Sequence, residues 1–153
     1  MMNLCCDVLT ALKGKTLATA ESCTGGGIGA ALTAIPGSSE VYKGGIISYT
    51  NWVKQNILAV SPELLAKEGA VSAAVAEAMA DGARKVLKSD ISVSVTGLAG
   101  PGADDFGNPV GTVYIGYSDE KHTISRKFQF DGGRGDIRKQ AIIESLNLIL
   151  QNN

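Results

Sequence analysis

The chain has 153 residues, of which 44% are hydrophobic and 19% charged, a balance typical of one globular domain over residues 1–153 with a sizeable core. Its 14 Lys and Arg residues nearly balance 15 Asp and Glu residues, so the composition argues against a nucleic-acid partner and against an acidic tail. We expect a cytoplasmic protein without signal peptide, membrane span or metal, because no apolar run approaches ~20 residues and the three cysteines lack metal-ligand spacing.

Hydrophobic periodicity and capping residues predict helices that alternate with strands, followed by a late strand hairpin. In chain order we expect a helix over 4–12, a strand over 16–20, a helix over 26–35, a strand over 41–49, a short helix over 52–58, helices that begin at 61 and 72, a strand over 91–96, a loop over 97–109, hairpin strands over 110–117 and 122–130, and a helix over 136–150. This order predicts a layered α/β domain with a mixed sheet.

Residues 20–27 read Ala-Glu-Ser-Cys-Thr-Gly-Gly-Gly and lie between a predicted strand and a predicted helix. Free backbone N–H groups at a helix start hold oxyanions or phosphates, and glycines let a ligand approach the backbone closely. Ser22 is therefore a candidate nucleophile; Cys23 competes with it, although nothing in the sequence favours its thiolate. We expect Glu21 to pair with a basic neighbour. The residues expected to supply backbone donors to a substrate are Cys23, Thr24, Gly25 and Gly26.

A serine nucleophile needs a base, and the only histidine, His122, lies at a predicted hairpin edge, where a lone histidine is usually an inert surface residue. The other common solution is a lysine of lowered pKa, for which Lys54 is the best candidate. If Asn51 caps its helix, Lys54 is at the third position, where the helix dipole and partial burial both lower its pKa. Tyr49 is placed to relay a proton or to orient the lysine. The alternative is that Lys54 is a solvated surface lysine and that Tyr49 only packs within its strand.

Two further glycine-rich segments follow predicted strands. Residues 96–102 match no cofactor fingerprint, so we expect no cofactor, but Thr96 and Gly97 are candidates for substrate contact at the end of a strand; a plain connecting loop is the alternative. In residues 131–138, Arg134 and Arg138 lie one turn apart at a helix start, where the dipole disfavours cations. A bound anion would explain this pair, and pairing with neighbouring aspartates is the alternative.

Together these segments resemble the CinA C-terminal domain family (competence/damage-inducible protein), which includes nicotinamide mononucleotide deamidases. The resemblance covers nearly the whole chain, with Thr50 in place of the usual serine and an extra glycine at Gly133. It is carried by Ala-Glu-Ser-Cys-Thr-Gly-Gly at 20–26, Gly-Ser-Ser at 37–39, Tyr-Thr-Asn-Trp-Val-Lys at 49–54, Gly-Ala-Val-Ser at 69–72, Thr-Gly-Leu-Ala-Gly-Pro-Gly at 96–102, Pro-Val-Gly-Thr-Val-Tyr at 109–114 and the Gly-x-Arg-x-x-x-Arg spacing at 132–138.

The resemblance implies a three-layer α/β/α sandwich that hydrolyses the carboxamide of nicotinamide mononucleotide to nicotinate mononucleotide and ammonia, in NAD recycling. It implies catalytic roles for Ser22, Tyr49 and Lys54, and we expect Arg134 or Arg138 to hold the substrate phosphate. We also expect a homo-oligomer, because Gly- and Ala-rich surfaces permit close association. The alternative function is a non-enzymatic module that binds a nucleotide or a partner protein in competence or the DNA damage response.

Overall fold

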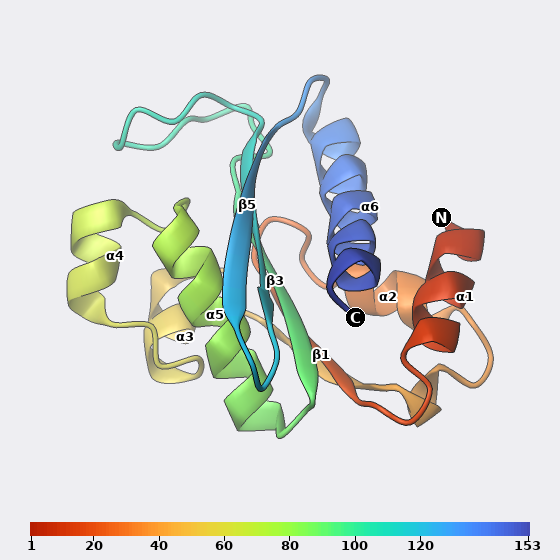
Figure 1. Cartoon of the computed structure of the whole chain (residues 1–153). Helices are drawn as coiled ribbons and strands as arrows, with labels where there is room; N and C mark the ends of the chain where they lie inside the picture. The colour runs from red at the N-terminus through yellow and green to blue at the C-terminus, as the bar shows by residue number, and fades with distance from the viewer.

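The computed structural model describes residues 1–153 and contains one five-stranded sheet in the order β2-β1-β3-β4-β5 (Figure 1). The parallel strands are β1 (Leu17–Glu21), β2 (Tyr42–Ile47) and β3 (Ile91–Gly97). The antiparallel strands are β4 (Thr112–Ser118) and β5 (Thr123–Gln129), which form the expected hairpin. The sheet is mixed because helical crossovers connect the parallel strands and a short turn connects the last two.

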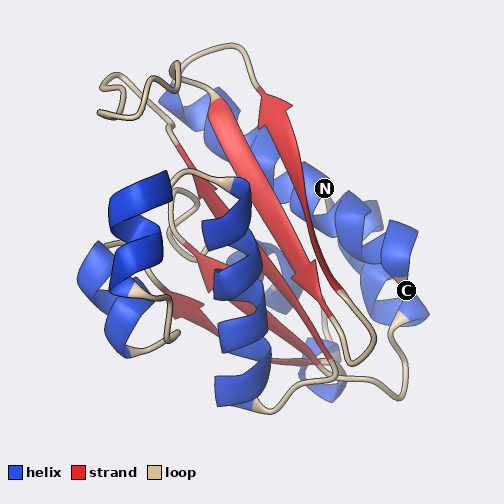
Figure 2. Ribbon diagram, turned by 60° about the vertical axis from the view of Figure 1, so that its left-hand side comes forward, coloured by secondary structure: helices blue, strands red, loops and turns tan.

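Helices cover both faces of the sheet, which confirms the three-layer α/β/α architecture (Figures 1 and 2). On one face lie α1 (Met2–Ala11), α2 (Gly27–Thr33) and α6 (Arg134–Asn152), and on the other lie α3 (Asn51–Asn56), α4 (Pro62–Glu68) and α5 (Ala73–Leu87); a 3₁₀ turn, η1, spans Ser38–Glu40. The larger apolar core, of 21 buried residues, lies under the first set of helices, and a smaller one, of 7, lies under the second. No helix is long and apolar enough to cross a membrane.

Side-chain caps start the helices of the second layer, as the sequence indicates. The hydroxyls of Ser61 and Ser72 accept hydrogen bonds from the N–H groups of Leu64 and Val75, three residues along. The last helix begins at Arg134, two residues before the predicted start, because the Asp136 carboxylate accepts the Gly133 N–H at 2.9 Å and supports an additional half turn.

The carboxyl ends of the three parallel strands meet at one edge of the sheet, which is where open α/β sheets bind ligands. Two backbone hydrogen bonds continue the ladder past the strand ends: Ser22 N–H donates to Val95 O at 3.0 Å, and Ser48 N–H donates to Glu21 O at 2.8 Å. The residues after β1 and β2 are therefore held side by side. This arrangement brings together three segments that the sequence singled out separately.

Candidate active site

A buried serine–lysine pair lies at this edge of the sheet. Lys54 Nζ is 2.9 Å from Ser22 Oγ, although the two residues are 32 positions apart in the chain. Ser22 is 8% exposed and Lys54 only 1%, so the pair is nearly withdrawn from water. The turn after β1 carries the hydroxyl, and α3 carries the amine. The structure thus brings together the two residues expected to act as nucleophile and base.

Lys54 has two further hydrogen-bond partners, both backbone carbonyls of the segment after β2. Nζ lies 2.6 Å from Ser48 O and 3.4 Å from Tyr49 O. A neutral amine has two N–H donors and one lone pair, so the carbonyls can take both donors while the lone pair faces the Ser22 hydroxyl. An ammonium has three donors, and the third can then be given to Ser22 Oγ. Both protonation states are satisfied in the same geometry, as a base that cycles between them requires.

Burial is the main cause of a low pKa at Lys54, which falls from 10.5 to about 8. The expected contribution of the helix dipole is corrected by the structure. Thr50, not Asn51, caps α3, because its hydroxyl accepts the Val53 N–H, and Lys54 is therefore at the fourth position of a six-residue helix, in its last turn. A cation there is not disfavoured by the dipole, so desolvation alone accounts for the direction of the shift.

Tyr49 contributes to the site in two ways that differ from the expected relay. Its carbonyl accepts the long hydrogen bond from Lys54, and its hydroxyl accepts one from Arg134 Nη2 at 3.3 Å. The side chain is 58% exposed and stands at the mouth of the site. The phenol has no hydrogen bond to Lys54 or Ser22, so it is not placed to pass a proton directly to either residue. Arg134 is fixed on its other side by Gly100, whose carbonyl accepts Nη1 at 2.8 Å.

A cavity of about 290 Å³ opens onto the serine–lysine pair. Its wall combines polar side chains, the serine–lysine pair among them, with apolar ones. It is lined by Ser22, Cys23, Tyr49, Asn51, Lys54, Ala70, Val71, Thr96, Gly97, Ala99 and Arg134. Asn51, Ala70, Val71 and Ala99 are additions to the expected set, and all four lie in segments named in the family resemblance, 49–54, 69–72 and 96–102.

Thr96 and Gly97, the last two residues of β3, both line the cavity, and each also has a structural role. The Thr96 hydroxyl donates to Ala70 O at 2.8 Å, which ties the segment before α5 to the end of the strand. A Cβ on Gly97 would lie 2.9 Å from Thr112 O, so only glycine lets β4 pack this closely here. Thr96 therefore offers a substrate its oxygen lone pairs, and its proton is already in use.

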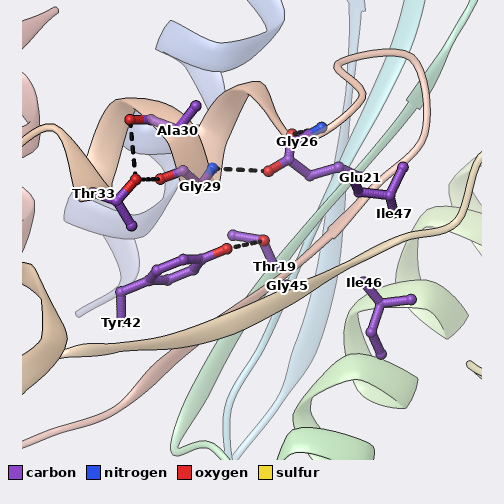
Figure 3. A pocket seen from close by; sticks show the side chains of 10 residues that line it. All are labelled: Thr19, Glu21, Gly26, Gly29, Ala30, Thr33, Tyr42, Gly45, Ile46 and Ile47. Atoms are coloured by element: carbon purple, nitrogen blue, oxygen red, sulfur yellow. Dashed lines mark hydrogen bonds between the residues drawn. The ribbon is translucent and has the colours of Figure 1, made fainter.

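The structure corrects the expectation that Glu21 pairs with a basic neighbour. Its carboxylate, 1% exposed, accepts hydrogen bonds from the Thr24 hydroxyl at 2.6 Å and from the N–H groups of Gly26, Ile28 and Gly29 at 2.9–3.1 Å. Figure 3 shows Glu21 aimed at the first turn of α2, beside a second cavity of about 220 Å³. The carboxylate thus occupies the positive end of the helix dipole. This end of α2 is closed to an anionic ligand.

The same contacts narrow the set of oxyanion donors. Gly26 N–H is committed to Glu21, and Gly25 N–H donates to Ser22 O at 3.1 Å, so the expectation that Gly25 and Gly26 bind substrate is wrong for their amides. The N–H groups of Cys23 and Thr24 have no acceptor in the protein. Of these residues only Cys23 lines the cavity. The Cys23 N–H is therefore a free donor at the cavity wall next to the nucleophile, and the Thr24 N–H is a second free donor in the same turn.

The two arginines of the 132–138 motif have different environments. Arg134 lines the cavity mouth, whereas Arg138 does not line it and is half-buried against the turn after β1. Arg138 Nε donates to Cys23 O at 3.1 Å, and Nη2 donates to Thr24 O at 3.0 Å. Neither arginine forms an ion pair with an aspartate, so the alternative of local salt bridges is excluded. Arg134 is the one placed to meet a substrate anion.

The competing nucleophile and the competing base are both unsuitable. Burial raises the pKa of the Cys23 thiol to about 11, so the thiol is protonated near neutral pH. His122 lies in the β4–β5 turn, where its Nδ1 is 3.1 Å from Asp119 Oδ1, and it is not among the residues that line the cavity. No group of three or more His, Cys, Asp or Glu side chains is arranged to hold a metal ion.

These features define a three-layer α/β domain with a buried serine–lysine pair at the carboxyl ends of its parallel strands. The family model for the CinA C-terminal domain matches residues 2–152, and the chain belongs to this family. Similar curated proteins are a CinA-like protein of Synechococcus sp. (strain RCC307), 51% identical over 139 residues, and one of Endomicrobium trichonymphae, 48% identical over 135. The matches cover 90% and 88% of this chain, which spans about a third (33% and 32%) of the length of these relatives.

Solved structures of the same superfamily have the same fold. A CinA superfamily protein from Escherichia coli is 33% identical with a TM-score of 0.95, and the match covers 98% of this chain and 88% of that one. The competence/damage-inducible protein CihA from Agrobacterium tumefaciens is 36% identical with a TM-score of 0.94, covering 98% and 93%. The mixed sheet and its two helical layers are therefore those of the superfamily.

Proposed function

We propose that this domain hydrolyses the carboxamide of nicotinamide mononucleotide, with Ser22 as nucleophile and Lys54 as base. The observation that carries the proposal is the buried contact of 2.9 Å between Ser22 Oγ and a lysine whose pKa is about 8. A lysine of ordinary pKa is protonated at neutral pH and cannot accept the hydroxyl proton. Membership in a family that the sequence motifs connect with nicotinamide mononucleotide deamidation supports the choice of substrate.

The reaction proceeds in two halves. Ser22 Oγ bonds to the carboxamide carbon while neutral Lys54 takes the hydroxyl proton, and the resulting oxyanion is held by the free N–H groups next to Ser22. Lys54 then gives this proton to the amide nitrogen, the C–N bond breaks and ammonia leaves an ester on Ser22. In the second half, Lys54 accepts a proton from water, which attacks the ester. The serine recovers its proton and nicotinate mononucleotide is released.

The cavity suits the two ends of this substrate. Its apolar wall of Ala70, Val71 and Ala99 accommodates an aromatic ring next to Ser22, and Arg134 at the mouth supplies a charged donor to a phosphate. Tyr49 holds Arg134 through its hydroxyl and Lys54 through its carbonyl. The proposal thus assigns the phosphate to Arg134 and not to Arg138, which does not line the cavity.

The test is to incubate the purified domain with nicotinamide mononucleotide and to measure ammonia and nicotinate mononucleotide. Both products are expected, and each of Ser22→Ala and Lys54→Ala is expected to lower the rate by at least about 10³-fold. Activity that survives both substitutions would overturn the mechanism. Nucleotide binding without any product would instead support the non-enzymatic alternative.

The proposed contact between Arg134 and the phosphate is tested by comparing a substrate that has the phosphate with one that lacks it. Arg134→Ala is expected to raise KM for nicotinamide mononucleotide by about 10-fold or more, as expected for loss of a charged hydrogen bond, and to leave the phosphate-free nicotinamide riboside unaffected. An equal effect on both substrates would refute a phosphate contact at Arg134.

A further inference from the structure

Arg138 connects the last helix to the turn that carries Ser22. Its guanidinium reaches two successive carbonyls, those of Cys23 and Thr24, although it is more than 100 positions away in the chain. A Cβ placed on Gly25 would lie 3.7 Å from Nη2, an ordinary van der Waals distance, so the guanidinium packs directly beside the backbone of this turn. No carboxylate lies within ion-pair distance of Arg138, so these carbonyls are its partners.

The hydrogen bond from Arg138 to the Cys23 carbonyl also orients the Thr24 N–H, which belongs to the same peptide unit. The Cys23 carbonyl and the Thr24 N–H belong to one planar trans unit, so they point in opposite directions. A donor that holds the carbonyl on the α6 side also fixes the N–H toward the other side, and it polarises the unit so that the N–H becomes a stronger donor. Thr24 N–H is one of the two amides of this turn without an acceptor.

The turn is thus held from two directions by oppositely charged side chains. Glu21 takes the amides that follow the turn, and Arg138 takes the carbonyls within it. The free N–H groups of Cys23 and Thr24 remain between them, next to Ser22. The positive charge of Arg138 also acts on this region, since it favours the thiolate form of Cys23 and so any negative charge that develops there.

We infer that Arg138 is a positioning residue for Ser22: by fixing the carbonyls of Cys23 and Thr24 it holds in place the turn that carries Ser22 and the free amides of Cys23 and Thr24, the donors proposed for the oxyanion. The inference rests on the proposed role of Ser22 as nucleophile. It replaces the anion-binding role that the arginine spacing suggested, because Arg138 does not line the cavity and two of its nitrogens donate to carbonyls of the protein.

The test uses a fluorophosphonate probe, which reports the nucleophile and its oxyanion site without any assumption about the natural substrate. Ser22 Oγ forms a bond to phosphorus, fluoride leaves, and the hydroxyl proton passes to Lys54. Intact-protein mass spectrometry gives the labelling rate of the domain and of Arg138→Met. The variant is expected to react about 10- to 100-fold more slowly, as for displaced oxyanion donors. Arg138→Lys keeps the positive charge but loses the planar guanidinium that bonds both carbonyls. This variant is expected to recover only part of the labelling rate that Arg138→Met loses.

Arg126→Met is the matched control, because Arg126 is an exposed arginine on β5 that bonds to Gln151 on α6, away from the site. It is expected to label at the rate of the unsubstituted domain, and thermal unfolding establishes that each variant is folded. Equal labelling of Arg138→Met, Arg138→Lys and the unsubstituted domain would overturn the inference. Absence of labelling in the unsubstituted domain would instead count against the proposed nucleophile.

Discussion

Replacing Lys54 by methionine tests whether burial lowers the pKa of this lysine. The unfolded chain binds the lysine proton with a pKa of 10.5 and the folded chain with a pKa of about 8, so the unfolded chain holds more protons between these values. Stability from this group is therefore present above pH 10.5 and is lost as pH falls through 8. The total cost of the buried ammonium at pH 7 is about 3 kcal/mol. Lys54→Met removes this cost, together with its pH dependence.

The quantity to measure is the difference in free energy of unfolding between the unsubstituted domain and Lys54→Met, from urea titrations at pH 7 and pH 10. We expect the unsubstituted domain to gain about 2.5 kcal/mol relative to the variant over this range. Lys139→Met, at an exposed lysine of α6, is the control and is expected to show no such change. A difference that stays constant from pH 7 to pH 10 would refute a pKa lowered by burial.

Three more predictions follow from the same contacts. The rate constant kcat/KM should rise with pH and level off above an apparent pKa of about 8, the value at Lys54, and a profile that is flat from pH 6 to 9 would exclude this lysine as base. Glu21→Gln should lower the free energy of unfolding by about 1–3 kcal/mol in urea titrations, because a buried amide cannot accept every bond of the carboxylate, and exposed Glu40→Gln should change it little. Gly82→Ala should destabilise the domain by about 1–3 kcal/mol, because the new Cβ would lie 2.1 Å from the Leu58 carbonyl oxygen. Gly135→Ala, whose Cβ would have nothing within 4 Å, is the control and should not destabilise the domain in this way. Equal thermal unfolding midpoints for these two variants would contradict the close packing at Gly82.

Local signals predicted the fold well, because they depend on neighbours in the chain. The caps at Ser61 and Ser72 start the helices that the sequence indicates, and the turn between β4 and β5 closes the expected hairpin. The ends of β1 and β3 lie within one residue of the predicted ends, whereas β2 ends at Ile47, two residues before the predicted end. One helix end shows the same difference: α2 ends at Thr33, two residues before the predicted end.

Long-range contacts explain what sequence reasoning missed at the site. The role of Lys54 could be suggested from its position, but its low pKa comes from burial by segments elsewhere in the chain, and the helix cap invoked for it is displaced by one residue. Glu21 was expected to need a cation, yet a carboxylate that is separated from a helix by one short turn can accept the free N–H groups of that helix. The partners of Arg138 lie 114 and 115 positions away, and no spacing rule finds them.

The most direct test of the central claim is to find the ester on Ser22. The domain is mixed with saturating nicotinamide mononucleotide and quenched in acid within the first turnovers, and the peptide that contains Ser22 is analysed by mass spectrometry. We expect a nicotinate mononucleotide acyl group on Ser22, and no such group in Ser22→Ala. Formation of nicotinate mononucleotide at an undiminished rate by Ser22→Ala, or an acyl group on a different residue, would contradict the central claim.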